Sequence, residues 1–314
     1  MAYITGTAAT FADVKTAVEN ACTANGWTLS SGILSKNACF IKLVATAGEL
    51  SIAGGTGQSG STLTGVPDGP YKEAKMVSPN VDPISFPVNY EIHLFTDPDE
   101  VYCVINYNSD FYQQLSFGKS NIPGIGGTGC WFTGCFGASA TASNIGSYGQ
   151  KTFLTASETS WGFGGYVPTA NMCGLFADSG PSVTTSFIHC GLDSVEWLDA
   201  YGITNSAGSR QGPEYCASLI NALPNLSNQA TILLPIKCVK PRTSSGRTIV
   251  ASLNNARYTR IDNIVPGEII TFGADQWKIY PFLRKDATVR NGVGWSSGAT
   301  HSGTFGYAIK YTGT

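Results

Sequence analysis

Hydrophobic and polar positions near the start of the chain repeat with the period of an α-helix. The apolar positions at this spacing are Phe11, Val14, Val18, Ala21 and Cys22. Thr10 and Asp13 form a Thr-x-x-Asp pattern typical of a helix N-terminus, and Asn25-Gly26 is a typical stop. We therefore predict one amphipathic helix that begins at Thr10 and ends at Asn25-Gly26.

Most of the remaining sequence has the short apolar runs and the alternation of period two that are typical of β-strands. Strand-like runs cover residues 27–30, 38–44, 49–53, 231–237, 247–253, 277–283 and 306–311. The clearest hairpin joins Tyr90–Leu94 to Val101–Tyr107 through a turn at Thr96–Glu100. Short helical pieces are expected around residues 193–198 and 213–223.

A glycine-rich stretch at Gly54–Gly60 has the composition of a phosphate-binding loop. It lacks the Lys-Ser/Thr pair that such a loop needs, and no helix follows it. We interpret this stretch as a flexible loop or linker.

Together these elements predict a mainly β fold with a small N-terminal α+β module, in which one helix packs on a small sheet. We place this module at residues 1–75. A β-rich body of antiparallel, sandwich-like sheets follows at residues 76–314, and a further division near residue 240 is left open. A chain of 314 residues can bury a sizeable core without a disulfide or metal.

The chain carries few charges. Asp, Glu, Lys and Arg make up 13% of its residues, against about 25% in soluble globular domains. A surface this poor in charge favours a protein whose surface is largely covered by neighbours. A secreted Ser/Thr-rich β-protein is the alternative. The net charge of −2 and the absence of basic runs argue against nucleic-acid binding.

The N-terminal residues Met1–Thr5 do not form the basic and apolar regions of a secretory signal. No stretch approaches the roughly 20 apolar residues that cross a bilayer. We therefore expect synthesis in the cytoplasm without a signal peptide, and no insertion into a membrane.

Nine cysteines are scattered along the chain without a Cys-x-x-Cys pair. Cys130 and Cys135 are the closest two, and their spacing does not suit a zinc ribbon. Most cysteines adjoin apolar residues, so we predict buried free thiols and no metal site. Oxidation of some thiols in a particle that leaves the cell stays open.

Candidate catalytic groups are few. No serine stands in a nucleophile-elbow context, and no histidine completes a triad. Asp97, Asp99 and Glu100 form the densest acidic cluster, which we interpret as turn residues and not as a carboxylate pair. Other polar residues are interpreted as turn, surface or interface residues: Asp262, Glu268 and Asp275 around a type II turn at Pro266-Gly267, and Arg284, Lys285 and His301. We predict no catalytic, cofactor-binding or metal-binding residue.

Glycines and aromatic residues are interleaved between about residues 118 and 190. Such a region suits either an interface between subunits or a core with long turns. The candidate interface residues are Trp131, Phe132, Trp161, Phe163 and Tyr166, with Tyr307 and Tyr311 in the C-terminal strand.

Four passages, taken in order, resemble a family of tailed-bacteriophage virion proteins associated with the tail or baseplate. They are Asn25–Leu43, Tyr90–Lys119, Trp277–Arg284 and His301–Tyr311, each a loose pattern of aromatic residues and glycines. The resemblance implies an N-terminal α+β module, a β-rich body, contacts with other tail proteins and no cofactor. It carries over no active residues. The chain has more cysteines than this family leads us to expect, which leaves covalent cross-linking open.

The sequence therefore favours a non-enzymatic structural subunit of a phage tail or baseplate, assembled in the host bacterial cytoplasm and located in the virion. Its expected partners are copies of itself and other tail proteins. One alternative is a receptor- or carbohydrate-binding tail protein, because Trp and Tyr on a β scaffold stack on the sugars of a host surface glycan. A less favoured alternative is a polysaccharide depolymerase, which needs two carboxylates in one cleft.

Overall fold

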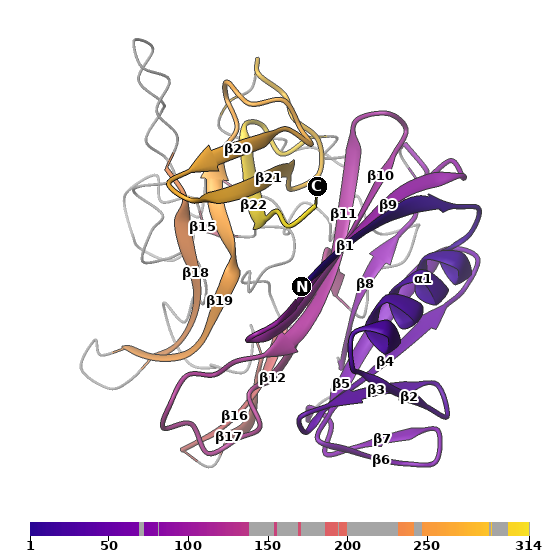
Figure 1. Cartoon of the computed structure of the whole chain (residues 1–314), viewed down its shortest axis with the longest axis vertical. Coiled ribbons are helices and arrows are strands. Elements are labelled where there is room, and N and C mark those ends of the chain that lie inside the picture. Colours follow the sequence, from indigo (N-terminus) through magenta and orange to yellow (C-terminus); the bar gives the residue numbers. More distant parts are fainter. Residues whose placement is uncertain are drawn as a thin grey trace.

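The computed structural model describes most of the N-terminal half of the chain and parts of the C-terminal half. The described residues are 1–68, 72–80, 82–137, 154–155, 169–170, 186–193, 195–199, 232–241, 247–288, 290 and 301–313. Within them the chain is mainly β, with one α-helix near the N-terminus and antiparallel sheets in a sandwich-like body (Figure 1). The fold class predicted from the sequence is confirmed.

A central sheet of seven antiparallel strands organises the molecule. In spatial order it contains β1 (Ala2–Ala8), β9 (Val88–Thr96), β10 (Asp99–Tyr107), β11 (Phe111–Lys119), β12 (Cys130–Gly134), β16 (Ser186–Leu192) and β17 (Val195–Asp199). Nearly every residue of β10, β11 and β12 is buried. These strands are buried on both faces because other elements cover the sheet on both sides.

A second sheet of six strands packs on one face of the central sheet. Its order is β13 (Phe136–Gly137), β8 (Glu73–Val77), β5 (Glu49–Gly55), β4 (Cys39–Ala45), β3 (Ile33–Lys36) and β2 (Thr28–Ser30). Strands β5 and β8 contact β12, and helix α1 (Phe11–Ala24) contacts β1 and β9 of the central sheet and β4 of the second sheet. One apolar core fills the space between these elements.

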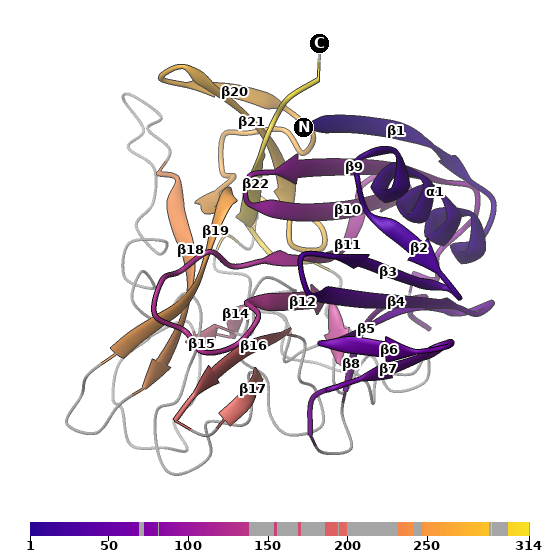
Figure 2. The same cartoon turned by 60° about the horizontal axis from the view of Figure 1, so that its bottom comes forward.

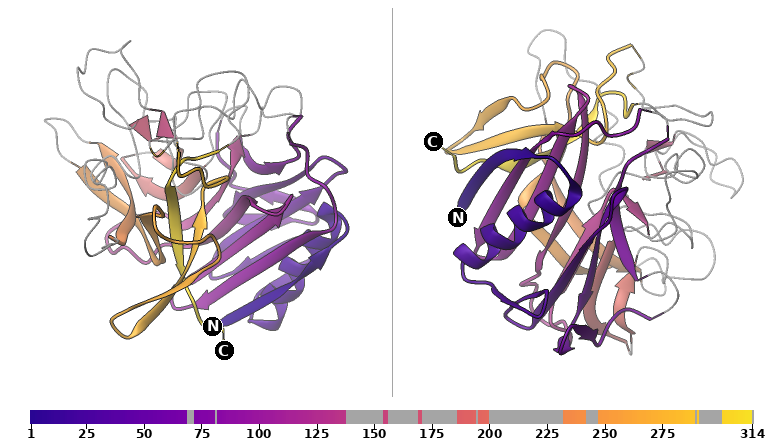
Figure 3. Two further views of the ribbon diagram at one scale, coloured as in Figure 1. Left: turned by 90° about the horizontal axis from the view of Figure 1, so that it is seen from above. Right: turned by 90° about the vertical axis from the view of Figure 1, so that its right-hand side faces the viewer.

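A third sheet of five strands lies against the opposite face of the central sheet (Figure 2). Its order is β18 (Leu234–Pro241), β19 (Arg247–Arg260), β22 (Phe305–Lys310), β21 (Asp275–Pro281) and β20 (Ile269–Phe272). Two small hairpins complete the described strands: β6 (Gly57–Ser59) with β7 (Thr62–Thr64), and β14 (Leu154–Thr155) with β15 (Thr169–Ala170). Both chain ends lie close together beside the third sheet (Figure 3), where the rings of Tyr3 and Tyr311 are 4.9 Å apart.

Two local predictions from the sequence are confirmed in detail. Thr10 is the N-cap of α1, and its hydroxyl oxygen accepts a hydrogen bond from the Asp13 N–H at 3.2 Å. All five apolar residues predicted for the inner face of the helix are buried. At Pro266-Gly267 the φ of +85° at Gly267 and the hydrogen bond from the Glu268 N–H to the Val265 carbonyl match a type II turn.

Two other predictions are wrong. Gly54–Gly60 is not a flexible loop, because it contains the end of β5 and all of β6. A Cβ atom at Gly54 would lie 2.5 Å from the Phe132 ring, so glycine here allows close sheet packing. Residues 195–199 form strand β17 and not a helix, since they pair with β16 at the edge of the central sheet.

The predicted division at residue 75 falls inside β8, which is part of the second sheet. Strand β1 pairs with β9 of the central sheet and not with β2–β5. The region near residue 240 falls at the end of β18, which belongs to the third sheet. Residues 213–223, the second predicted helical piece, lie outside the described residues.

Candidate functional site

The aromatic residues proposed as an interface occupy different environments. Trp131, Phe132 and Tyr307 are only 1%, 0% and 1% exposed. They fill the core of their own chain, so in this conformation their side chains offer no surface to a partner, and we correct their assignment. Tyr311 is half-buried and packs edge-on against Tyr3. The remaining three, Trp161, Phe163 and Tyr166, lie outside the described residues.

The acidic cluster at the β9–β10 hairpin is divided between solvent and core. Asp97 is exposed in the turn, whereas Asp99 and Glu100 are buried residues of β10. The turn interpretation is therefore wrong for these two. Asp99 forms an ion pair with Lys36 of the second sheet at 2.7 Å. Because neighbouring strand residues point to opposite faces, Asp99 and Glu100 do not form a carboxylate pair in one cleft.

Glu100 connects the central sheet to a bulge in the third sheet. The pairing of β18 with β19 shifts register beside Asn254 and Asn255, which leaves their backbone N–H groups available. Glu100 accepts both N–H groups, at 2.8 and 3.0 Å, and also the Asn255 side-chain amide and the Tyr102 hydroxyl, each at 2.8 Å. Burial raises the pKa of Glu100, while all four hydrogen bonds favour its ionised form.

Glu91 forms a second connection between the same two sheets. Its carboxylate accepts hydrogen bonds from the Tyr3 hydroxyl at 2.5 Å and the Tyr280 hydroxyl at 2.8 Å, and Lys278 lies 2.5 Å away. Burial opposes ionisation, but these three donors outweigh it and lower the pKa of Glu91. His93 bonds to the Tyr280 hydroxyl at 2.8 Å. Burial lowers the pKa of His93 to about 3, so its ring is neutral.

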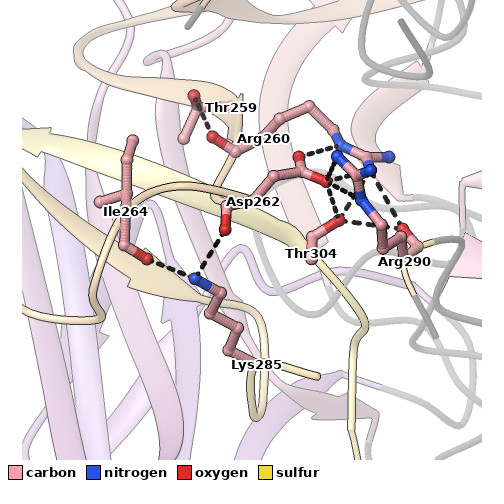
Figure 4. Close-up of polar contacts among 7 residues, drawn as sticks. All are labelled: Thr259, Arg260, Asp262, Ile264, Lys285, Arg290 and Thr304. Carbon is pink, nitrogen blue, oxygen red and sulfur yellow. Dashed lines mark hydrogen bonds and ion pairs between the residues drawn. The ribbon is translucent and has the colours of Figure 1, made fainter. Parts of the chain in front are cut away.

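Asp262 is the centre of a charged cluster inside the third sheet region (Figure 4). Its side chain is 3% exposed and forms ion pairs with Arg260 at 2.9 Å and Arg290 at 2.5 Å. The Thr304 hydroxyl donates a third bond at 3.0 Å. Burial opposes ionisation here too, but the two arginines lower the pKa of Asp262. Lys285 donates to the backbone carbonyls of Asp262 and Ile264 at 3.0 and 2.8 Å.

His189 binds the glycine-rich segment that precedes β12. Its Nδ1 accepts the Thr128 N–H at 2.9 Å, and its Nε2 lies 2.9 Å from the Glu196 carboxylate. This Glu-His-Thr order resembles a hydrolase triad, but the backbone N–H of Thr128 occupies the nitrogen that would act as the base. The N–H groups of Gly127 and Gly129 already donate to β16 carbonyls, so they form no oxyanion hole. The arrangement therefore fixes a loop.

The remaining predicted polar residues make local contacts. Arg284 forms an ion pair with Asp110 at 2.7 Å, where both side chains are partly exposed. His301 Nδ1 accepts the Gly303 N–H at 3.0 Å. Two acidic residues also have partners close by: Glu268 accepts the Val265 N–H, and Asp275 forms an ion pair with Lys310.

Seven cysteines are described, all seven are buried, and no disulfide joins any two of them, as predicted: Cys22, Cys39, Cys103, Cys130, Cys135, Cys190 and Cys238. Burial raises the pKa of Cys103 to about 12, so this thiol is protonated and unreactive. Cys173 and Cys216 lie outside the described residues. The described part of the chain contains no group of three or more His, Cys, Asp or Glu placed to hold a metal ion. It also contains no helix long and apolar enough to cross a membrane.

The buried polar clusters were not predicted from the sequence. Glu91 and His93 alternate with apolar residues, and such alternation is the ordinary pattern of a strand with one solvent-facing side. A signal was available in the partner strand, because Val101–Tyr107 is apolar at nearly every position and not at alternate ones. Such a strand is covered on both faces, and a neighbouring strand then carries its polar residues into an interface. The link from Asp262 to Arg290 had no comparable signal.

The chain matches no protein-family model and no curated protein sequence.

Proposed function

We propose that this chain is a structural subunit of a tailed-phage particle, located in the tail or baseplate, that contacts copies of itself and neighbouring tail proteins. In this role its own residues carry out no catalysis and need no cofactor. The subunit is assembled in the host cytoplasm and remains in the virion. The loose resemblance of four sequence passages to tail proteins supplies the phage context of this proposal.

The structural role is supported by the bonds that the buried charged groups form within their own chain. Glu91, Glu100 and Asp262 each accept three or more hydrogen bonds or ion pairs from their own chain. Two of these groups connect one sheet to another. Groups with this many fixed partners stabilise a rigid body, and they have little freedom to bind and transform a substrate.

The low charge of the chain also supports a covered surface. Several large apolar side chains are exposed, including Val265 at 68% and Phe272 at 62% near strand β20. Apolar groups that are exposed in the isolated chain are suited to contacts inside an assembly.

The proposal is tested on purified phage particles. Quantitative mass spectrometry and a cryo-EM map of the particle should find the chain in several copies per tail or baseplate. If the chain occurs only in the lysate and never in purified particles, the proposal is wrong.

The sequence also suggested a second candidate function, that of a glycan-binding tail protein. Its premise was exposed tryptophan and tyrosine, but Trp27, Trp131 and Trp277 are buried. Trp197 is half-buried, and its indole N–H donates to the Gly65 carbonyl at 2.8 Å. A glycan array with the isolated chain tests this candidate, and specific binding would replace the purely structural role.

A further inference from the structure

The end strands of the three large sheets differ in how well they are protected against pairing with another strand. Natural edge strands are usually short, or they carry charges or proline. Strands β2, β13 and β20 have two to four residues. Strand β17 contains Glu196 and Asp199, and β18 contains two prolines and two lysines. Each of these five edges has a recognised protection.

Strand β1 has none of these protections. It is an edge of the central sheet and has seven residues, Ala2–Ala8, with no charge and no proline. The first charged side chain in the sequence is Asp13, which lies in the helix. Tyr, Ile and Thr supply strong β propensity to β1. Among the described strands, only β9 pairs with β1, and its other side is open in Figure 2.

The backbone groups that β1 directs outward follow from the register of the sheet. The Ser120 N–H donates to the Gly129 carbonyl, so even-numbered residues of β11 bond toward β12. The two bonding sides of an antiparallel strand alternate residue by residue, and the pairings from β11 to β1 contain no bulge. Even-numbered residues of β1 therefore bond to β9, and Tyr3, Thr5 and Thr7 direct their N–H and C=O groups outward.

We propose that this open edge of β1 binds β1 of a second copy of the chain, antiparallel, around a two-fold axis at Thr5. In this register Thr5 faces Thr5 of the second copy, and Tyr3 faces its Thr7. Each of these three pairs exchanges two backbone hydrogen bonds, and the two central sheets become one continuous sheet.

The side chains of β1 fit this partner. Thr5 and Thr7 are exposed in the isolated chain, and threonine pairs across strands are favourable. Ile4 faces Gly6 of the second copy, where the ring of Tyr90 covers the glycine and offers Ile4 an apolar contact. No charge opposes a like charge, because β1 contains none. A two-fold contact of this kind is the commonest form of self-association.

The inference rests on the proposed function only for the premise that copies of the chain meet. Its test uses the full chain without an N-terminal tag, studied by sedimentation velocity over a concentration series. We expect the wild type to show a monomer–dimer equilibrium. Thr5→Pro removes an outward N–H and leaves the bonds to β9 intact, so the monomer keeps its fold. It should weaken dimerisation about 10- to 100-fold.

Thr5→Val is the matched control, because it keeps the outward N–H and the β propensity. It should dimerise within about threefold of the wild type. Circular dichroism and thermal unfolding of both variants should match the wild type, which separates loss of dimerisation from loss of folding.

A charge pair tests the two-fold register directly. Thr5→Lys and Thr5→Glu each place like charges opposite one another, so each variant alone should dimerise several-fold more weakly than the wild type. Position 5 also lies opposite Glu91 of its own chain, so thermal unfolding of each variant is measured beside its dimerisation. An equal mixture of the two should dimerise more strongly than either variant alone, and added salt should weaken this heterodimer.

A wild type that stays monomeric at all concentrations would overturn the inference, and so would a dimer unchanged in Thr5→Pro and Thr5→Lys. Neither outcome tests the place of the chain in the virion, which depends on its presence in purified particles.

Discussion

The central sheet makes two junctions of opposite character. Toward the second sheet and α1 it presents mainly apolar side chains, such as Leu115, Phe117 and Phe132, which pack without directional bonds. Toward the third sheet its apolar packing is interrupted by Glu91, Glu100 and other polar groups held by specific hydrogen bonds. Apolar packing depends on shape and area, whereas the polar junction depends on each donor having its acceptor.

This difference has a consequence for the tolerance of each junction to substitution. A smaller side chain in the apolar junction leaves a cavity, and its cost depends on how far the neighbours relax. A lost partner in the polar junction leaves a buried donor or charge without compensation. The two junctions therefore fail for different reasons, and single substitutions can distinguish them.

The largest expected effect is in the apolar junction. Phe132 is fully buried, and its ring stacks on Phe187 at a centroid distance of 4.7 Å. Phe132→Ala should lower the free energy of unfolding by about 3–5 kcal/mol, measured by chemical denaturation. A loss below about 1 kcal/mol would show that this junction is loosely packed.

Gly54 provides the matched second variant for this test. A Cβ atom at Gly54 would meet the Phe132 ring, so Gly54→Ala should destabilise the wild type. In the Phe132→Ala background the same methyl group enters the cavity, and its cost should disappear or reverse. Additive effects of the two substitutions would contradict the direct contact.

The next largest effect is expected at Glu100 in the polar junction. Glu100→Gln replaces one acceptor oxygen by an NH2 group that faces N–H or O–H donors. We expect a loss of about 2–4 kcal/mol in unfolding free energy despite the nearly unchanged volume. Asp97→Asn in the same hairpin is the control, because Asp97 is exposed and should tolerate the change. Equal stability of both variants would argue against the bonds to Asn254 and Asn255.

A smaller effect that depends on pH is expected at Asp262. Its pKa is lowered in the folded chain, so the unfolded chain binds a proton more readily. The stability that Asp262 contributes is therefore present above its usual pKa of 3.8 and is lost as the pH falls below it. Asp262→Asn should destabilise the protein by about 1–3 kcal/mol at pH 7, and less at pH 3.

Urea unfolding at the two pH values measures this difference. Asp275→Asn is the control, because the Asp275–Lys310 pair is partly exposed and contributes little. If Asp262→Asn has the same cost at pH 7 and pH 3, ionisation of Asp262 does not stabilise the cluster.

In the apolar junction the sequence predicted helix α1 but not the packing of Phe132 on Gly54, and it predicted nothing of the polar junction. The inner face of α1 followed from helical spacing at Phe11, Val14 and Val18, because helix periodicity is a local property. Short apolar runs located β18, β19, β21 and β22 of the third sheet, whereas β20 was not among the predicted strands. Which sheet each strand joins was not found, since the pairing of β1 with β9 joins residues far apart in sequence.

Buried charges are the hardest feature to predict, because a charged residue in a strand ordinarily indicates a solvent-facing position. Glu91 and Glu100 are buried only because donors from β21 and β19 reach them. Those donors lie more than 150 positions away in the sequence. Periodicity gives no information about such pairs.

The smallest expected effect is at the N-terminus of α1, where sequence and structure agree most closely. Thr10→Ala removes the hydroxyl that accepts the Asp13 N–H and should cost about 1 kcal/mol of unfolding free energy. Thr10→Ser keeps the acceptor and should cost less. Thr16→Ala, on the exposed face of the same helix, should be neutral or stabilising, because alanine has the higher helix propensity. Equal losses for Thr10→Ala and Thr16→Ala would mean that the cap adds nothing once the apolar face of α1 is packed.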